Sequence, residues 1–268
     1  MDAWLAYGFL QRALVAGVFV AIACAILGLF VVLRRDAMIG HGLAHVTFGG
    51  VALGLVLNIL PLAVALLTAV AAAWGIVKLK EKAGLHGDTA IGIFSTAGLA
   101  LGIGLASLAH SFNVDLMSYL FGDILAIEPI EVWLSLLLAA IVIGSILANY
   151  HPLLFLTFDK EAARASGIKP HRLDLLLTVL TAVTVVLGMK VVGLLLVTGL
   201  LIIPAAASLQ LASNFKQTLW LSSLVAFVSV TAGLAVAVAL DLPPAASIVL
   251  LSFLFFGGFF LLRRQKRR

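Results

Sequence analysis

The chain has 268 residues, of which 63% are hydrophobic and only 11% are charged, and its mean hydropathy is +1.21. A soluble domain carries about 25% charged residues, and a chain this short cannot enclose so much apolar surface in a water-soluble core. The composition therefore predicts an integral membrane protein. The apolar runs are continuous and approach the roughly 20 residues that a membrane-spanning helix needs, which favours helices over a β-barrel.

We expect an all-α, polytopic transmembrane bundle of about eight to nine spans, with residues 1–268 forming one domain. The first run follows no basic stretch and continues to Leu33, so we expect it to remain as a span rather than to be a cleaved signal peptide. Cys24 lies alone in this run, which excludes a disulfide within one chain and predicts a packing role. The seventh span is separated from the sixth only by a tight turn at Lys190. In chain order the expected spans are Phe9–Leu33, Ile39–Ile59, Leu62–Leu79, Thr89–Leu108, Ile130–Asn149, Leu173–Gly188, Val191–Leu209, Thr218–Leu240 and Ala245–Leu262.

The basic residues test this arrangement, because Lys and Arg gather in cytoplasmic loops. With nine spans and an external N-terminus, 15 of the 17 basic residues fall on the cytoplasmic side, and only Arg12 and Lys190 do not. The pattern predicts a multi-pass membrane protein surrounded by lipid. It also explains the pI of about 9.6 as a topology signal, so no nucleic-acid partner is expected.

Glycines recur at close spacing in the second and fourth spans. Gly50 and Gly54 are four residues apart, and Gly98, Gly102 and Gly104 form a similar group. Small residues at this spacing let helix backbones approach closely in lipid, so we expect these glycines to mark tight packing.

The segment between the fifth and sixth spans carries signals for a short helix. Thr157 can cap its start, and Asp159 and Glu161 suit the positive end of the helix dipole. Gly167 can end the helix, and Pro170 is expected to prevent it from resuming. These residues predict an amphipathic cytoplasmic helix over about 157–167. Composition alone fits a docking helix and an ordinary helix lying on lipid about equally.

Several segments, in the same order, resemble the permeases of metal-type ABC importers. Residues 158–168, Phe-Asp-Lys-Glu-Ala-Ala-Arg-Ala-Ser-Gly-Ile, resemble the coupling helix of that family. Residues 88–93 resemble its DTAIGI motif, and residues 192–207 are similar to its VG.LL…LLI.PAA span. Residues 114–125 contain its LFGD motif, in a longer form that looks most like the zinc-uptake branch. The resemblance extends from about residue 34 to about residue 250.

The resemblance implies a permease without catalytic residues that works as a homodimer in a bacterial-type cytoplasmic (inner) membrane. A separate cytoplasmic ATPase dimer would dock on the coupling helices, and an extracytoplasmic metal-binding protein would deliver the ion. The sequence contains no G-x-x-x-x-G-K-[ST] phosphate loop, so ATP would be bound by the partner. No tightly bound cofactor is implied, only a transported zinc, manganese or iron(II) ion. The implied ATPase-coupling residues are Phe158, Asp159, Lys160, Glu161, Arg164 and Gly167.

Two histidines lie at helical spacing near the cytoplasmic end of the second span. Residues four apart share a helix face, so His41 and His45 are expected to point together. Imidazole is a good zinc ligand, but two ligands are too few, so a second copy, acidic groups or water would have to complete the site. The alternative is that each histidine hydrogen-bonds a neighbouring helix. Ionisable residues inside a membrane are usually functional, which favours the transport path.

The family pattern at this position, GD.L.H, has an acidic residue where this chain has His41, whereas His45 matches the family histidine. The loss of a carboxylate disfavours oxygen-preferring ions such as manganese and modestly favours zinc.

Acidic residues gather on the expected outer side and could concentrate cations at an entrance. Asp123, after Gly122, is the candidate metal-binding residue there, although each of these acids could instead be a helix cap or a solvated loop charge. The others are Asp2, Asp115, Glu128, Glu131 and Asp241.

Other transport classes remain open at this level. A secondary transporter driven by an ion gradient would usually show an inverted repeat with broken helices, and neither is evident. A permease for a metal chelate would need a wider aromatic cavity, whereas aromatic residues are only 9% of this chain. A scaffold without transport function would leave the histidine pair and the coupling segment unexplained.

Overall fold

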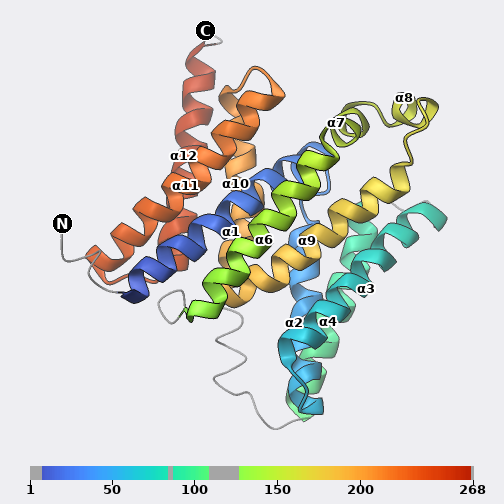
Figure 1. The fold of residues 1–268 in the computed structure, drawn as a ribbon, viewed down its shortest axis with the longest axis vertical. Coiled ribbons are helices and arrows are strands. Elements are labelled where there is room, and N and C mark those ends of the chain that lie inside the picture. The colour runs from blue at the N-terminus through green and yellow to red at the C-terminus, as the bar shows by residue number, and fades with distance from the viewer. Residues whose placement is uncertain (1–7, 84–86, 109–126, 267–268) are drawn as a thin grey trace.

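The computed structural model describes residues 8–83, 87–108 and 127–266, and in these ranges every regular element is a helix (Figure 1). Nine of the described helices are long and apolar enough to cross a membrane. They match the nine expected spans to within four residues at either end, including the seventh. The helices are α1 (Gly8–Leu33), α2 (Ile39–Leu57), α3 (Pro61–Lys82), α4 (Gly87–Leu108), α6 (Pro129–Ala148), α7 (Tyr150–Phe158), α8 (Lys160–Ala165), α9 (Pro170–Val192), α10 (Leu194–Leu211), α11 (Phe215–Leu240) and α12 (Pro244–Lys266).

Local sequence accounts for several helix ends. Pro61, Pro129 and Pro170 occupy the first turn of α3, α6 and α9, where the missing N–H costs nothing. Pro170 follows the extended Lys169 and begins α9, so α8 does not continue through it, as expected. Asn58 and Asp241 end α2 and α11 with a φ of 53°, a left-handed conformation that short polar side chains tolerate.

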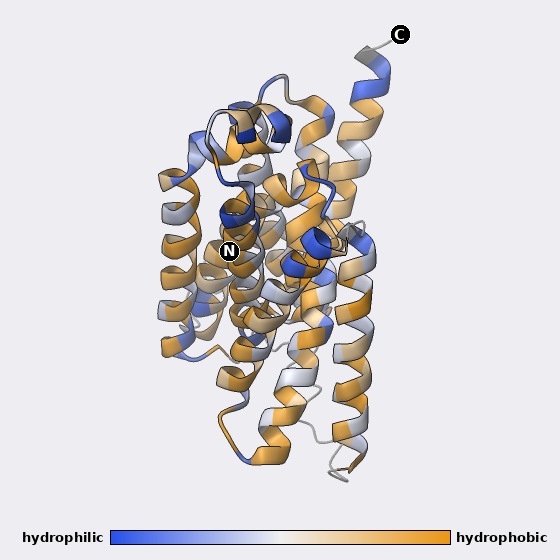
Figure 2. Cartoon of the chain, turned by 90° about the vertical axis from the view of Figure 1, so that its right-hand side faces the viewer, coloured by the Kyte–Doolittle hydropathy of each residue, from blue (hydrophilic) through white to orange (hydrophobic). Residues whose placement is uncertain are grey.

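The bundle is organised around α1, α2 and α9, which are the most enclosed spans. Helix α1 packs against α6, α9, α10 and α11, whereas α2 packs against α3, α4 and α9. Because α9 contacts both α1 and α2, it joins the two groups of helices. Figure 2 shows apolar residues along the lengths of the spans and polar residues at their ends, as a bilayer requires.

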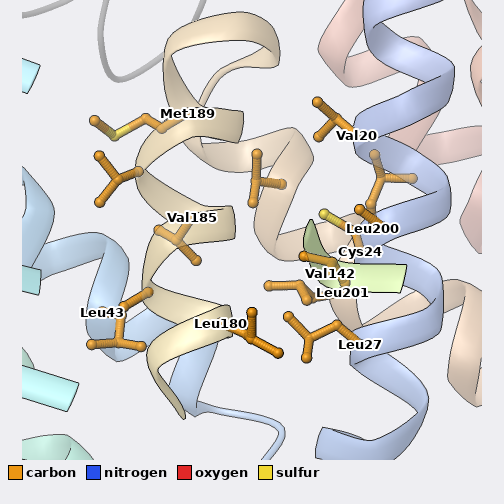
Figure 3. Packing of buried hydrophobic residues seen from close by; sticks show 14 of the residues in the cluster. Val20, Cys24, Leu27, Leu43, Val142, Leu180, Val185, Met189, Leu200 and Leu201 are labelled. Atoms are coloured by element: carbon orange, nitrogen blue, oxygen red, sulfur yellow. The ribbon is translucent and has the colours of Figure 1, made fainter. Parts of the chain in front are cut away.

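The core between α1, α9 and α10 is aliphatic and closely packed (Figure 3). Cys24 is fully buried there beside Leu27 and Leu200, which confirms its packing role. Met189 is 1% exposed and also belongs to this core, so it packs rather than standing free as a ligand.

Glycines allow the closest helix contacts, as expected for four of the five. A Cβ on Gly98 would lie 2.6 Å from the Cα of Val46, so α4 meets α2 backbone to backbone. Gly50 and Gly54 face the start of α3, and Gly102 faces Phe48 and Gly49 of α2. Gly104 is the exception, because a Cβ there would meet nothing within 4 Å.

Ion pairs and hydrogen bonds gather the basic helix ends at one end of the bundle. Lys80 of α3 lies 2.6 Å from Asp36 in the α1–α2 loop. Arg263 near the end of α12 donates to Gln210 near the end of α10 at 2.9 Å. At the other end of α9, Lys190 lies in the last helical turn and pairs with Glu131 in the first turn of α6 at 3.2 Å. The tight turn expected at Lys190 lies instead at Gly193.

We predict that Gly98→Leu destabilises the bundle by about 1–3 kcal/mol, because the added side chain must force α4 away from α2. Gly104→Leu is the matched control, since its site is open and it should leave stability nearly unchanged. Thermal unfolding of the detergent-purified chain measures both. Equal unfolding temperatures for the two variants would contradict the close α2–α4 contact.

Candidate functional site

The histidine pair forms on the first turns of α2. The two Nε2 atoms of His41 and His45 lie 3.1 Å apart, and the rings meet edge to face with centroids 4.6 Å apart. Helical spacing brings them together, as predicted, and one ring nitrogen donates a hydrogen bond to the other. The alternative of separate hydrogen bonds to neighbouring helices does not describe this pair.

The distance between the two Nε2 atoms is close to the distance between two nitrogen ligands of one zinc ion. Two nitrogens that lie 2.0–2.1 Å from a tetrahedral zinc are about 3.3 Å apart. The observed 3.1 Å is therefore close to this spacing, and an ion would replace the proton that the two nitrogens share.

The pair also lies at an opening in an otherwise enclosed helix. In α2, 72% of the span is buried, yet His41 is exposed and His45 is half-buried. Gly40 and Gly42 on either side of His41 are buried against Leu201 and Ile91. The imidazoles therefore face away from the neighbouring helices of this chain, where an ion or a second subunit could reach them.

The outer acidic residues are only partly described. Asp123 and Asp115 lie outside the described residues. Glu128 and Glu131 form a capping box at the start of α6, and Glu131 is buried and also bound to Lys190. These two carboxylates act as a helix cap, which was one of the two expected roles. Among the residues that the structure describes, no group of three or more His, Cys, Asp or Glu side chains could hold a metal.

The coupling segment is two helices rather than one. The apolar α7 follows α6 directly and buries Leu153 and Leu156, a helix that we did not expect. Chain direction changes at Asp159, whose carboxylate accepts a hydrogen bond from the Ala162 N–H at 2.8 Å and caps α8. The expected cap at Thr157 is wrong, because its hydroxyl donates back to Leu153 inside α7.

Helix α8 presents a charged, open face. Phe158 is 67% exposed just before it, and Ala163 is its one buried residue. Gly167 ends the segment with a φ of +84°, as expected for a left-handed stop. The other exposed residues of the segment include Lys160, Glu161 and Arg164.

A cavity of about 750 Å³ lies between α8 and the ends of α1, α3 and α9. Its lining carries five basic and three acidic side chains. Although the Lys160 side chain is 59% exposed, its partial burial at the cavity lowers its pKa, and the nearby cations Arg34 and Arg164 lower it further. Burial also lowers the pKa of Arg34, against the opposing effect of Asp36.

One carboxylate in this cavity holds two cations. Asp174, in the first turns of α9, pairs with Arg34 through Oδ1 and lies 3.4 Å from the Nζ of Lys160 through Oδ2. Our sequence analysis did not single out Asp174. The available signal was an acidic residue within the first two turns of a span, where a charge needs a partner.

The described residues thus form nine apolar helices and, at one end, the short helices α7 and α8, of which α8 is charged. This is the architecture of a polytopic membrane protein. Residues 6–262 match the family model described as the ABC 3 transport family. The chain therefore belongs to this family and is the permease subunit of an ABC importer for divalent metal ions, resident in the cytoplasmic membrane. This membership excludes the gradient-driven, chelate and scaffold alternatives.

Relatives agree along nearly the whole chain. The manganese transport system membrane protein MntC of Halalkalibacterium halodurans is 34% identical over 256 residues, covering 96% of this chain and 88% of the relative. The high-affinity zinc uptake system membrane protein ZnuB of Haemophilus influenzae is 35% identical over 254 residues, covering 93% and 96%. The structure of PsaBC from Streptococcus pneumoniae in complex with Fab superposes with a TM-score of 0.85 at 32% identity, covering 97% of this chain and 93% of that one.

We predict that Asp159→Ala loosens α8 by about 1 kcal/mol, because the helix loses its only side-chain cap. Hydrogen exchange of the amides of residues 160–165 should accelerate several-fold, while that of α9 stays unchanged. Thr157→Ala is the control, since its hydroxyl does not cap α8. Faster exchange in both variants, or in neither, would contradict the assignment of the cap.

Proposed function

We propose that this permease imports zinc and works as a homodimer. An extracytoplasmic binding protein delivers the ion to a path between the two copies, and His41 and His45 bind it transiently near the cytoplasmic end. A cytoplasmic ATPase dimer supplies the energy and docks on α8 through Phe158, Asp159, Lys160, Glu161, Arg164 and Gly167. No tightly bound cofactor is required. Family membership supports the ATPase and binding-protein partners in kind, and their identities are part of the proposal.

The observation that carries the proposal is the 3.1 Å separation of the two imidazole nitrogens on an exposed turn of an enclosed span. Two such groups inside a membrane protein are costly unless they serve the transported ion. They are also too few to trap it, which suits transport, since an ion bound too tightly is not released.

A second copy of the chain can complete the coordination. Zinc sites in proteins are usually four-coordinate, and the described part of one chain offers two nitrogens here. A twofold axis beside α2 would bring the histidine pairs of two copies together and supply four nitrogen ligands. Water could complete the coordination at other stages of the path. We propose that Asp123 binds the ion at the outer entrance.

Zinc is favoured by the chemistry of the ligands, whereas manganese is favoured by the names of several relatives. Imidazole suits zinc and iron, and carboxylates and carbonyls suit manganese. Manganese permeases from two Listeria species and two streptococci match at 31–33% identity. Manganese import is therefore the second candidate.

We predict that ATP-dependent uptake of radioactive zinc falls at least tenfold in both His41→Ala and His45→Ala. The measurement uses vesicles containing this chain, its ATPase and its binding protein, with and without ATP. The double variant should lose little more than either single variant, because the two nitrogens act as one site. His151→Ala is the control, since this exposed histidine of α7 lies outside the pair.

Each outcome has a separate meaning. Uptake that survives both substitutions would overturn the histidine site. Excess manganese that abolishes zinc uptake would favour the manganese importer. Uptake without ATP would contradict the role of the ATPase.

We also predict that His41→Asp raises the ratio of manganese to zinc uptake. The change restores the acidic residue of the family pattern and replaces a nitrogen ligand with oxygen. Initial uptake rates of the two ions, measured in the same vesicles, give the ratio. An unchanged ratio would show that residue 41 does not select the ion.

A further inference from the structure

Asp174 joins three segments that are far apart in the sequence. Its two carboxylate oxygens face Arg34, which follows α1, and Lys160, the first residue of α8. The Asp174 side chain is 18% exposed and that of Arg34 is 12% exposed. Water therefore screens the Arg34 pair little, and it should persist.

The Lys160 side of this junction is different. The Lys160 side chain is 59% exposed, and its Nζ lies 3.4 Å from Oδ2. An exposed pair at this distance is weak and forms and breaks easily. The junction thus has one enclosed contact, to Arg34, and one exposed contact, to Lys160, that a displacement of α8 would lengthen.

Helix α8 has few other connections to the bundle. Within the described chain it packs mainly on α7 and α9, and the cavity of about 750 Å³ separates it from the ends of α1 and α3. A displacement of α8 is therefore transmitted to α1 poorly by packing. The charged side chains that cross the cavity offer a direct route.

The Arg34 side leads to the histidine pair. Residues 34–38 form a short, hydrogen-bonded loop between α1 and α2, with Asp36 N–H donating to Val31 and Ile39 N–H donating to Asp36. Lys80 of α3 holds the same loop through Asp36. This hydrogen-bonded loop connects Arg34 directly to the first turn of α2, where His41 lies.

We infer that Asp174 is a positioning residue that carries the movement of α8 to the start of α2, and so links ATP hydrolysis in the partner subunit to the release of the ion at His41 and His45. This inference rests on the proposed function. It assigns to one carboxylate a role in coupling, distinct from metal binding and from ATPase docking.

The test measures the number of zinc ions moved per ATP hydrolysed by the assembled complex in vesicles. We expect Asp174→Asn to retain ATPase activity within about twofold of the unaltered complex, while zinc uptake falls at least tenfold. Asp174→Glu should restore most of the ratio, because it keeps both oxygens. Glu81→Gln is the matched control, since Glu81 lines the same cavity but pairs with His171 instead.

A second variant guards against misfolding, because Asp174→Asn leaves Arg34 without its carboxylate. Lys160→Gln removes the exposed contact to Asp174 and keeps the Arg34 pair. Because Lys160 also belongs to the proposed docking surface, a loss of docking would lower zinc uptake and ATPase activity together and leave their ratio unchanged. Lys160→Gln should lower the ratio of zinc to ATP at least threefold, whereas Lys169→Gln, at the exposed start of α9, should not.

The failures of the two proposals are distinguishable. If the unaltered complex shows no ATP-dependent uptake, the proposed function fails. If it shows uptake, and both Asp174→Asn and Lys160→Gln keep the normal ratio or lose uptake and ATPase activity in parallel, the role of Asp174 in coupling is overturned.

Discussion

A bilayer core offers no hydrogen-bond partners to a polypeptide backbone, and the architecture of this chain follows from that constraint. Each segment inside the membrane must satisfy its own amides and carbonyls, and a helix does this without help from a neighbour. Nine such helices account for most of the described residues. Because lipid is as apolar as leucine, the helices associate through close packing rather than through a hydrophobic drive. The backbone contact of Gly98 with Val46 is one result of that requirement.

The same constraint gives weight to polar side chains in the end turns of spans, next to the apolar part of the bundle. His41 and His45 lie on the same span and hydrogen-bond each other rather than a neighbouring helix. Asp174 lies in another span and holds two cations. In a soluble protein such groups could be incidental, since water would satisfy them. Next to the bilayer such groups are rarer and more often functional, so we propose the metal site and its link to α8 at these residues.

The geometry of the cytoplasmic end also separates two tasks. Helix α8 is exposed and has few contacts with the rest of the bundle, which suits a segment that a partner subunit binds and displaces. Helix α2 is enclosed along most of its length, as suits a segment that must hold two ligands in register. Arg34, Asp36 and Lys80 lie between them and belong to elements that remain packed. This division fits an importer in which hydrolysis of ATP and binding of the ion occur on different chains.

The sequence by itself determined the nine spans and the sorting of basic residues to one end, because both depend on hydropathy and charge. It also determined the His41–His45 pair, which depends on helical spacing, and the left-handed turn at Gly167, which depends on the conformation of one residue. It failed where a residue had more than one local option. Thr157 and Asp159 are both good caps, and only the packing of Leu153 and Leu156 extends α7 far enough to leave Asp159 at the start of α8. Only the tertiary structure decided that Lys190 pairs with Glu131 and that Asp174 joins Arg34 to Lys160. These partners lie 14 to 140 residues apart, and nothing in their own neighbourhoods specifies which distant charge will meet them.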